Sequence, residues 1–331
     1  MRIGFIATGG TISSTFSMME GGAVPSLSSR DLLLNIEKFI KDMKIEVSPI
    51  VDFSKVPGTS LSLEDLLELS KAVKRMAQDE DVEGIVITMG TPAIEEASYF
   101  LDITYDLDKP VIVTGAMRNP SLPGTDAWMN LTDSILVASS RRLNGFGVVV
   151  VMGSEIHSAR DVVKTNTISV SAFKSPNWGP LGYVYGNDVH LISKTNFLRE
   201  RIHLNPNSLI KEDVLVLKSV LGMRQELIED ILFKTNNTGI VLEIAGGGRV
   251  NKQLLDPIER YIRETSKPVV VASRLRTGPL MRTYGGKESI LYLERKGAIL
   301  ANFLTPEKAR MKLILALSSK YSGKLNDFFY P

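Results

Sequence analysis

The sequence predicts an α/β protein with a larger N-terminal domain, whose parallel-rich sheet is covered by helices, and a smaller C-terminal α/β domain. Two observations predict this class. Short apolar runs alternate with amphipathic helical patterns, which is typical of a parallel sheet with helices on both faces. The chain also has 331 residues, whereas a single domain typically has about 150. We therefore expect two domains.

Four buried strands are expected in the first domain. Each is a short apolar run, and together they cover residues 3–7, 84–88, 110–114 and 147–152. A helix is expected to begin after Ser62, because this serine is followed three residues later by Asp65 and then by leucines at helical spacing. Further helices are expected over residues 94–101 and 126–138.

The alternation of strands and helices fades between about residues 182 and 213. Residues that break regular structure gather there, namely Gly186, Asn187, Asn205, Pro206 and Asn207. We therefore assign residues 1–185 to the first domain, 186–213 to a linker and 214–331 to the second domain.

The alternation resumes in the second domain. Strands are expected over residues 239–242 and 268–272, with a helix over about 254–264 between them. A last helix is expected to begin after Thr305, because this threonine cap precedes Pro306 at the first helical position. These elements predict a second, smaller sheet covered by helices.

Composition excludes several classes of function. Lys and Arg total 39 against 37 Asp and Glu, so no large field attracts nucleic acid or an anionic membrane. Cysteine is absent, which excludes disulfides, thiol nucleophiles and thiolate metal sites. The three histidines, His157, His190 and His203, lack the spacing of metal ligands. We expect no metal, and neither nucleic acid nor membrane as a partner.

The amino terminus predicts a cytoplasmic protein. Met1 and Arg2 precede only a brief apolar run over residues 3–7, which is too short for a signal peptide. No later apolar run approaches the roughly 18 residues that a membrane-spanning helix requires. The expected location is the cytoplasm.

Glycines and threonines follow three of the predicted strands, in residues 8–12, 88–92 and 114–118. In an open parallel sheet, ligands bind beyond the carboxyl ends of the strands, so these loops are expected to converge at one edge. Glycines let the backbone approach a ligand, and a threonine hydroxyl can attack a carbonyl when a base removes its proton. The alternative is that the glycines form a tight turn and the threonines cap the helices that follow.

A dinucleotide cofactor does not fit the first of these loops. Its paired glycines, Gly9 and Gly10, are not part of a Gly-x-Gly-x-x-Gly pattern, and no phosphate-loop lysine follows them. We expect no cofactor.

The first loop, Thr-Gly-Gly-Thr-Ile over residues 8–12, resembles the opening signature of the L-asparaginase family. Further segments similar to the family follow in its order across both domains, at 90–91, 94–97, 109–111, 115–118, 159–167, 177–182, 272–274, 277–278 and 305–310. The resemblance implies an amidohydrolase that converts L-asparagine to L-aspartate and ammonia through a threonine acyl-enzyme.

The same resemblance implies three catalytic residues. Thr11 matches the nucleophile, while Thr91 and Lys164 match the threonine and lysine that handle protons. A hydroxyl is a poor nucleophile at neutral pH, and a lysine serves as its base only if its surroundings lower its pKa. We therefore expect Lys164 within hydrogen-bond reach of Thr91.

Several family residues are missing. Pro92 replaces the carboxylate that holds the substrate's ammonium group and that completes the catalytic group to which the lysine belongs. Met89 replaces the usual histidine. No tyrosine precedes Tyr99, although the family has one on the mobile loop after the nucleophile; Gly21 and Gly22 occupy that region. Proline cannot accept a proton, so a divergent substrate pocket is expected.

The segment that binds the substrate's α-carboxylate in the family aligns with residues 58–60, where Thr59 or Ser60 can compensate for the usual serine. The residues expected to bind substrate are Gly58, Thr59, Ser60, Gly90, Pro92 and Ala116. The family also builds its site between subunits, so a homodimer or homotetramer is expected. Residues 245–249, which should face the partner's pocket, lack the family's asparagine.

Two alternatives to asparagine hydrolysis follow from these losses. One is an amidase or lactamase that acts on another carbon–nitrogen bond, because the losses affect amino-acid recognition more than the amide-attacking residues. The other is a non-catalytic homologue that only binds a ligand, because the carboxylate and the loop tyrosine are absent together. In each case the expected partner is a small molecule.

Overall fold

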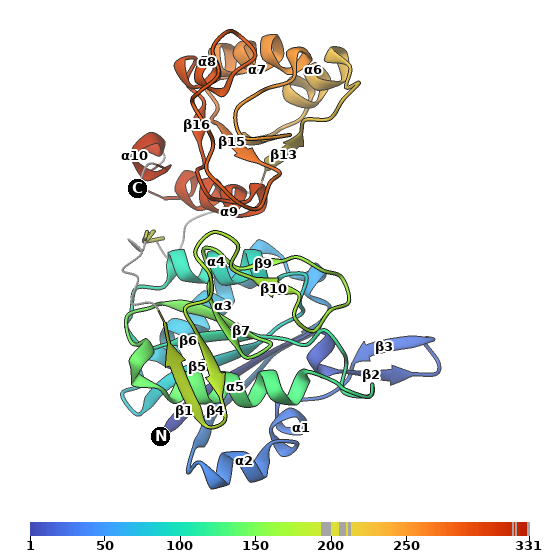
Figure 1. The fold of residues 1–331 in the computed structure, drawn as a ribbon, viewed down its shortest axis with the longest axis vertical. Coiled ribbons are helices and arrows are strands. Elements are labelled where there is room, and N and C mark those ends of the chain that lie inside the picture. Colours follow the sequence, from blue (N-terminus) through green and yellow to red (C-terminus); the bar gives the residue numbers. More distant parts are fainter. Residues whose placement is uncertain (193–199, 205–209, 211–212, 320, 322, 330–331) are drawn as a thin grey trace. The chain divides into compact units, whose positions relative to one another are not determined.

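The computed structural model describes residues 1–192, 200–204, 210, 213–319, 321 and 323–329. The chain divides into two compact units, Met1–Arg201 and Ile202–Pro331 (Figure 1). Each unit contains a sheet with helices packed against it, as the sequence predicts. In the part of the chain that is described, no helix has the length and apolar character needed to cross a membrane.

The first unit contains an eight-stranded sheet in the order β12-β11-β8-β7-β6-β5-β1-β4. The strands are β1 (Arg2–Gly9), β4 (Glu46–Val56), β5 (Val82–Thr88), β6 (Val111–Thr114), β7 (Val148–Met152), β8 (Glu155–Ser158), β11 (Gly182–Tyr185) and β12 (Asp188–Leu191). Strands β4, β1, β5, β6 and β7 are parallel, whereas β8, β11 and β12 add an antiparallel edge. The four predicted strands of this domain are confirmed.

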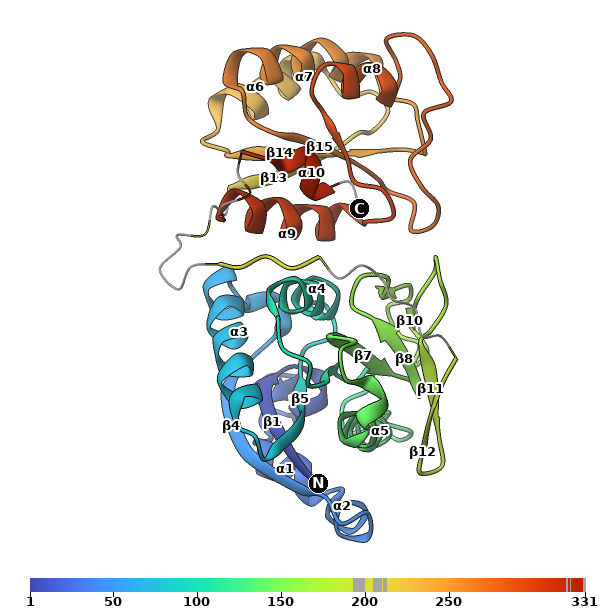
Figure 2. The ribbon, with the colours of Figure 1, turned by 90° about the vertical axis from the view of Figure 1, so that its left-hand side faces the viewer.

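Helices cover both faces of this sheet. They are α1 (Ser29–Leu34), α2 (Glu37–Asp42), α3 (Leu63–Gln78), α4 (Ile94–Thr104) and α5 (Ala127–Ser139), with short 3-10 turns at Thr11–Ser13, Gly58–Ser60 and Arg141–Leu143. Figure 2 shows α3 and α4 on one face and α5 on the other. Two small hairpins complete the unit, β2 (Ser14–Ser17) with β3 (Gly22–Pro25), and β9 (Val163–Lys164) with β10 (Phe173–Lys174).

Helix α3 begins where the sequence predicts. The Ser62 hydroxyl accepts the backbone N–H of Asp65, and the Asp65 carboxylate accepts the backbone N–H of Ser62. This capping box satisfies two N–H groups that a helix start leaves without partners. Leu66, Leu69 and Val73 recur at helical spacing and are buried, so one face of α3 packs into the core.

The register of the central strands brings three strand ends into one row. Ala7 of β1 pairs with Thr88 of β5, and Thr88 pairs with Thr114 of β6. Because these strands are parallel and adjacent, the loops that follow them leave the sheet at the same rim. The expected convergence of the Thr11, Thr91 and Ala116 loops at one edge is therefore confirmed.

A hairpin that the sequence did not predict ends the sheet. Tyr185 pairs with Asp188, so Gly186 and Asn187 form a two-residue turn between β11 and β12, and Gly186 has a φ of +59° that suits glycine. The same two residues mark the start of the predicted linker, 186–213. Within that range, residues 193–199, 205–209 and 211–212 lie outside the described residues.

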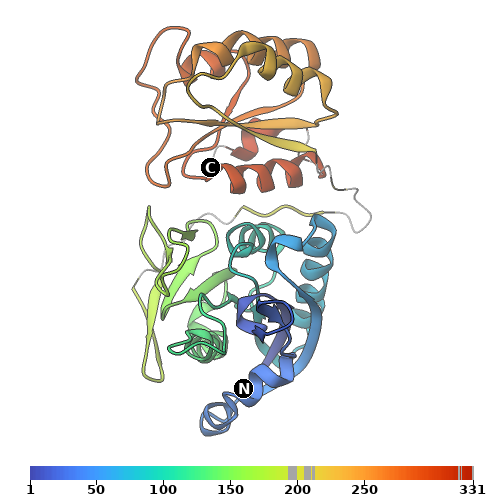
Figure 3. The same ribbon diagram turned by 90° about the vertical axis from the view of Figure 1, so that its right-hand side faces the viewer.

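The second unit is a four-stranded parallel sheet in the order β13-β14-β15-β16. Its elements are β13 (Val214–Lys218), α6 (Gln225–Lys234), β14 (Gly239–Ile244), α7 (Lys252–Thr265), β15 (Val269–Ser273), α8 (Ile290–Arg295), β16 (Ile299–Leu300), α9 (Pro306–Leu317) and α10 (Leu325–Phe329). Figure 3 shows α6 and α7 on one face of the sheet and α9 on the other. Helix α9 begins after its Thr305 cap with Pro306 in the first turn, as predicted.

Candidate active site

The backbones of three loops of the first unit meet at Gly90. A Cβ atom on Gly10 would lie 2.3 Å from the Gly90 Cα, and one on Gly90 would lie 2.6 Å from the Gly58 nitrogen. Real Cβ atoms do not approach other atoms so closely, so only glycine allows these loops to pack together. The contact brings Thr11, Thr91 and the turn at residues 58–60 to the same rim of the sheet.

Thr11 opens a 3-10 turn directly after the first strand. Gly9 and Gly10 have φ values of +95° and +85°, which L side chains rarely adopt. The Gly10 carbonyl then accepts three hydrogen bonds, from the Ser13 N–H at 3.1 Å, the Ser13 hydroxyl at 3.0 Å and the Ser14 hydroxyl at 2.9 Å. These contacts fix the turn and leave the Thr11 side chain only partly buried.

Lys164 lies beside Thr91, as the sequence predicts. Its Nζ donates a hydrogen bond to the Thr91 Oγ1 at 2.9 Å, and Thr91 is only 4% exposed. Partial burial lowers the pKa of Lys164, while the Glu95 carboxylate acts in the opposite direction. A lysine with a lowered pKa holds a neutral amine more readily at neutral pH, which suits it to accept a proton.

The predicted substrate-binding residues differ in exposure. Gly58 is buried, whereas Thr59 and Ser60 of the same 3-10 turn are exposed. Pro92 follows Thr91 directly and is also exposed. The structure thus places Gly58 and Gly90 in contact and leaves hydroxyl groups beside them, while the position next to Thr91 carries no charge.

The loop after β6 is held against the Thr91 loop. A Cβ on Gly115 would lie 2.6 Å from the Met89 carbonyl oxygen and 3.2 Å from the Thr91 Cγ2, and Ala116 is fully buried. Asp126 keeps the loop in place because its carboxylate accepts the backbone N–H of Met117 at 2.9 Å. The loop therefore packs against the Thr91 loop with little space between them.

Three residues that shape the rim were not predicted from the sequence. Asp126 accepts the N–H groups of the Ala116 loop, and Asn130 donates to the Gly115 carbonyl at 3.0 Å. Glu95 accepts the backbone N–H of Lys164 at 2.8 Å. Glu95 lies in a segment similar to the family, but a carboxylate in the first turn of a helix is ordinary and did not indicate this contact.

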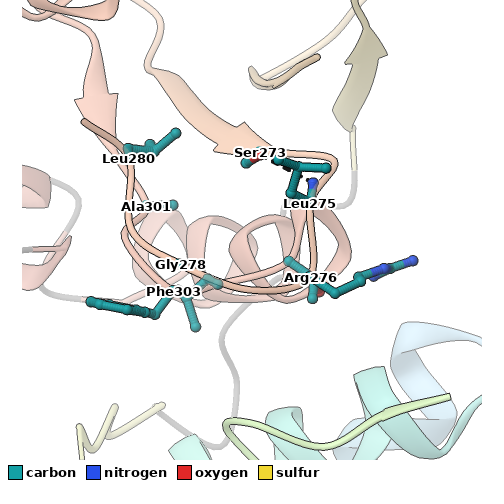
Figure 4. A pocket seen from close by; sticks show the side chains of 9 residues that line it. Ser273, Leu275, Arg276, Gly278, Leu280, Ala301 and Phe303 are labelled. Carbon is teal, nitrogen blue, oxygen red and sulfur yellow. Dashed lines mark hydrogen bonds between the residues drawn. The ribbon is translucent and has the colours of Figure 1, made fainter. Parts of the chain in front are cut away.

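A separate small pocket lies in the second unit, beyond the carboxyl ends of β15 and β16. Ser273, Arg276 and Phe303 are among the residues that line it. Figure 4 shows the Arg276 and Phe303 side chains pointing away from one another. Arg276 instead forms an ion pair with Glu307 at 3.1 Å. None of the predicted site residues lies in this pocket.

Comparisons with known proteins agree across the whole chain. The family model described as Asparaginase, N-terminal, matches residues 2–197, and the Glutaminase/Asparaginase C-terminal domain matches residues 213–325. The L-asparaginase of Bacillus licheniformis is 31% identical, over 99% of each chain. The probable periplasmic L-asparaginase of Haemophilus influenzae is 33% identical, over 99% of this chain and 92% of that protein. The crystal structure of a probable cytoplasmic L-asparaginase from Campylobacter jejuni has a TM-score of 0.86 at 28% identity, covering 99% of this chain and 98% of that one.

Proposed function

The chain belongs to the L-asparaginase family of amidohydrolases, and we propose that it hydrolyses the side-chain amide of L-asparagine to L-aspartate and ammonia. One observation carries the assignment to this site. The Lys164 amine donates to the Thr91 hydroxyl at 2.9 Å, and the loops of Thr91 and Thr11 are in backbone contact. A base, a proton-relaying hydroxyl and a nucleophilic hydroxyl therefore lie at one rim.

In the first half of the reaction, the Thr11 hydroxyl oxygen attacks the carbon of the amide carbonyl. Its proton passes through Thr91 to neutral Lys164 and from there to the amide nitrogen. The carbon–nitrogen bond breaks, ammonia leaves, and the acyl group remains on Thr11 as an ester. A positioned base of this kind typically accelerates such a step by about 10²- to 10⁴-fold.

In the second half, water attacks the ester carbon and transfers a proton along the same route. The ester bond breaks, the carboxylic acid product leaves, and the Thr11 hydroxyl is restored. Both halves place negative charge on the former carbonyl oxygen. The backbone N–H groups of Thr11 and Thr91 are the candidate donors to this oxygen, and each such donor typically contributes about 3 kcal/mol to the transition state.

The uncharged residue Pro92 supports a second candidate substrate class, amides or lactams without an α-ammonium group. It is exposed and uncharged next to Thr91, where the family resemblance calls for a carboxylate to hold the substrate's ammonium group. A charge-assisted hydrogen bond contributes about 1.5–3 kcal/mol, so its loss weakens recognition of asparagine in particular. An amide or lactam without a free α-ammonium group makes no such hydrogen bond, so the absence of the carboxylate does not weaken its binding. Such a compound is the alternative substrate.

Ammonia release tests the proposal. Purified wild-type protein is assayed with L-asparagine, L-glutamine and succinamate, the asparagine analogue that lacks the α-ammonium group. Thr11→Ala is expected to abolish release from every substrate, and Thr11→Ser to retain part of it because a hydroxyl remains. If wild-type protein releases no ammonia from these amides or from a broader amide panel, the proposed activity is wrong.

We also propose a cytoplasmic location and assembly into a homodimer or homotetramer. The Campylobacter relative is described as probably cytoplasmic, and the Haemophilus relative as periplasmic. The glycine-rich loop at residues 246–248 follows β14 and is the segment proposed to face a partner subunit.

A further inference from the structure

Lys164 is held in place from two directions. It ends β9, a strand of only two residues that pairs with β10, so the strand ladder by itself provides few hydrogen bonds. The second contact comes from α4, where the Glu95 Oε1 accepts the backbone N–H of Lys164 at 2.8 Å. Glu95 therefore anchors the lysine backbone although the two residues are 69 positions apart.

Glu95 also acts on the amine through its charge. Burial lowers the pKa of Lys164, and the Glu95 carboxylate raises it. Lys174, on the neighbouring strand β10, is engaged elsewhere because it forms an ion pair with Glu155 at 3.1 Å. Glu95 is thus a charge that bears on the Lys164 amine as well as a hydrogen-bond acceptor for its backbone.

The position that resembles the family's carboxylate holds Pro92, which can neither accept a proton nor carry charge. We propose that Glu95 is the positioning carboxylate of Lys164, fixing its backbone with one oxygen and balancing its amine with its charge. Glu95 acts through Lys164 and does not touch the substrate. This inference rests on the proposed function, because it assigns Glu95 to the proton transfer that Lys164 performs.

Two substitutions separate the anchor from the charge. Glu95→Gln keeps an oxygen that can accept the Lys164 N–H but removes the charge, whereas Glu95→Ala removes both. Glu68→Gln is the matched control, since Glu68 is an exposed carboxylate of α3 that pairs with Lys71. All three variants are compared with wild type by thermal unfolding, by kcat and KM for ammonia release, and by the pH profile of kcat/KM.

Glu95→Ala is expected to lower kcat by on the order of tenfold to a hundredfold, with a smaller change in KM, because a misplaced base slows the chemical step more than binding. Glu95→Gln is expected to keep kcat much closer to wild type. The acid limb of the pH profile of kcat/KM should move to lower pH in Glu95→Gln, because loss of the carboxylate lowers the pKa of Lys164. Glu68→Gln should match wild type in kcat, in KM and in the pH profile of kcat/KM.

A second readout does not depend on turnover. Competitive acetylation with acetic anhydride across a range of pH, followed by peptide mass spectrometry, reports the titration of the Lys164 amine. Its pKa should be lower in Glu95→Gln than in wild type and unchanged in Glu68→Gln. If wild type turns over no amide but this pKa still falls, the proposed function is rejected while the coupling of Glu95 to Lys164 is supported.

The inference is overturned by either of two results. One is an Lys164 titration in Glu95→Gln that superimposes on that of wild type. The other is a Glu95→Ala variant with unchanged kcat. If Glu95→Ala unfolds, Glu95→Gln decides the question by its acid limb and its labelling curve, because it retains the hydrogen-bond acceptor.

Discussion

A lysine amine can accept a proton only when it is neutral, and the surroundings of Lys164 lower its pKa and so raise the share of the neutral form. Its amine donates to the buried Thr91 hydroxyl, and partial burial lowers its pKa. The sign of the resulting pH dependence is fixed: below the pKa the amine is an ammonium group and cannot act as a base. Activity should therefore rise with pH through the pKa of Lys164.

We predict that kcat/KM falls on the acid side of its pH profile, and that Lys164→Met lowers kcat by about 10²- to 10⁴-fold. Lys164→Arg should be as inactive, because a guanidinium group stays protonated. Steady-state ammonia release between acidic and mildly alkaline pH measures both effects. A Lys164→Met enzyme with the wild-type profile would remove Lys164 from the mechanism.

Pro92 gives a prediction about substrate choice. Pro92→Asp should raise kcat/KM for L-asparagine by about tenfold relative to succinamate, because the new charge acts only on the substrate that carries an ammonium group. Ala93→Asp, which adds the same charge one residue later, is the control. Wild-type protein that already prefers asparagine strongly would show that another residue holds the ammonium group.

The rim consists of the ends of parallel strands and the loops that follow them. Glycines allow the backbones of these loops to touch. Gly90 contributes most to this contact, since Gly10 and Gly58 both pack against its backbone. The three loops can move apart only if the positions of Thr11 and Thr91 change. The packing of the loops and the positions of Thr11 and Thr91 are thus linked through one residue.

We predict that Gly90→Ala lowers kcat by on the order of a hundredfold, because its Cβ would lie 2.6 Å from the Gly58 nitrogen and must push the loops apart. Gly285→Ala is the control, since a Cβ there meets nothing within 4 Å. Ammonia release and thermal unfolding are measured for both. Normal kcat in Gly90→Ala would mean that the rim tolerates separation of its loops.

The start of α3 gives a prediction about stability. Ser62→Ala removes the hydroxyl that accepts the Asp65 N–H, and should lower the free energy of unfolding by about 1 kcal/mol. Ser62→Thr keeps a capping hydroxyl and should lose less. Urea unfolding of both variants measures the difference. Equal stability of Ser62→Ala and wild type would show that α3 is fixed by its buried leucines alone.

At the scale of the whole molecule, we predict that the chain assembles into a homodimer or homotetramer. Sedimentation velocity should give a mass of two or four times the 36.5 kDa chain, because the family resemblance implies a site shared between subunits. Dilution that dissociates the assembly should reduce activity in parallel. A monomer that is fully active in dilute solution contradicts this prediction.

The sequence by itself determined the fold class, the strands β1, β5, β6 and β7 of the first sheet and β14 and β15 of the second, and the common rim of the Thr11, Thr91 and Ala116 loops. Apolar periodicity and caps such as Ser62 and Thr305 act over a few residues, so they can be interpreted directly from the chain. The strand ends at Thr88 and Thr114 then follow from the rule that parallel strands place their carboxyl ends on one edge. The pairing of Lys164 with Thr91 came from the family resemblance, and the structure confirms the hydrogen bond.

Only the tertiary structure decided which distant groups meet. Glu95 was indistinguishable from an ordinary helix-start carboxylate until the fold brought it to the backbone of Lys164. Asp126 likewise gained its role by accepting N–H groups from the Ala116 loop, and Gly186 proved to turn a hairpin. Local patterns specify backbone conformation, whereas these contacts depend on how whole elements pack, which no short stretch of sequence encodes.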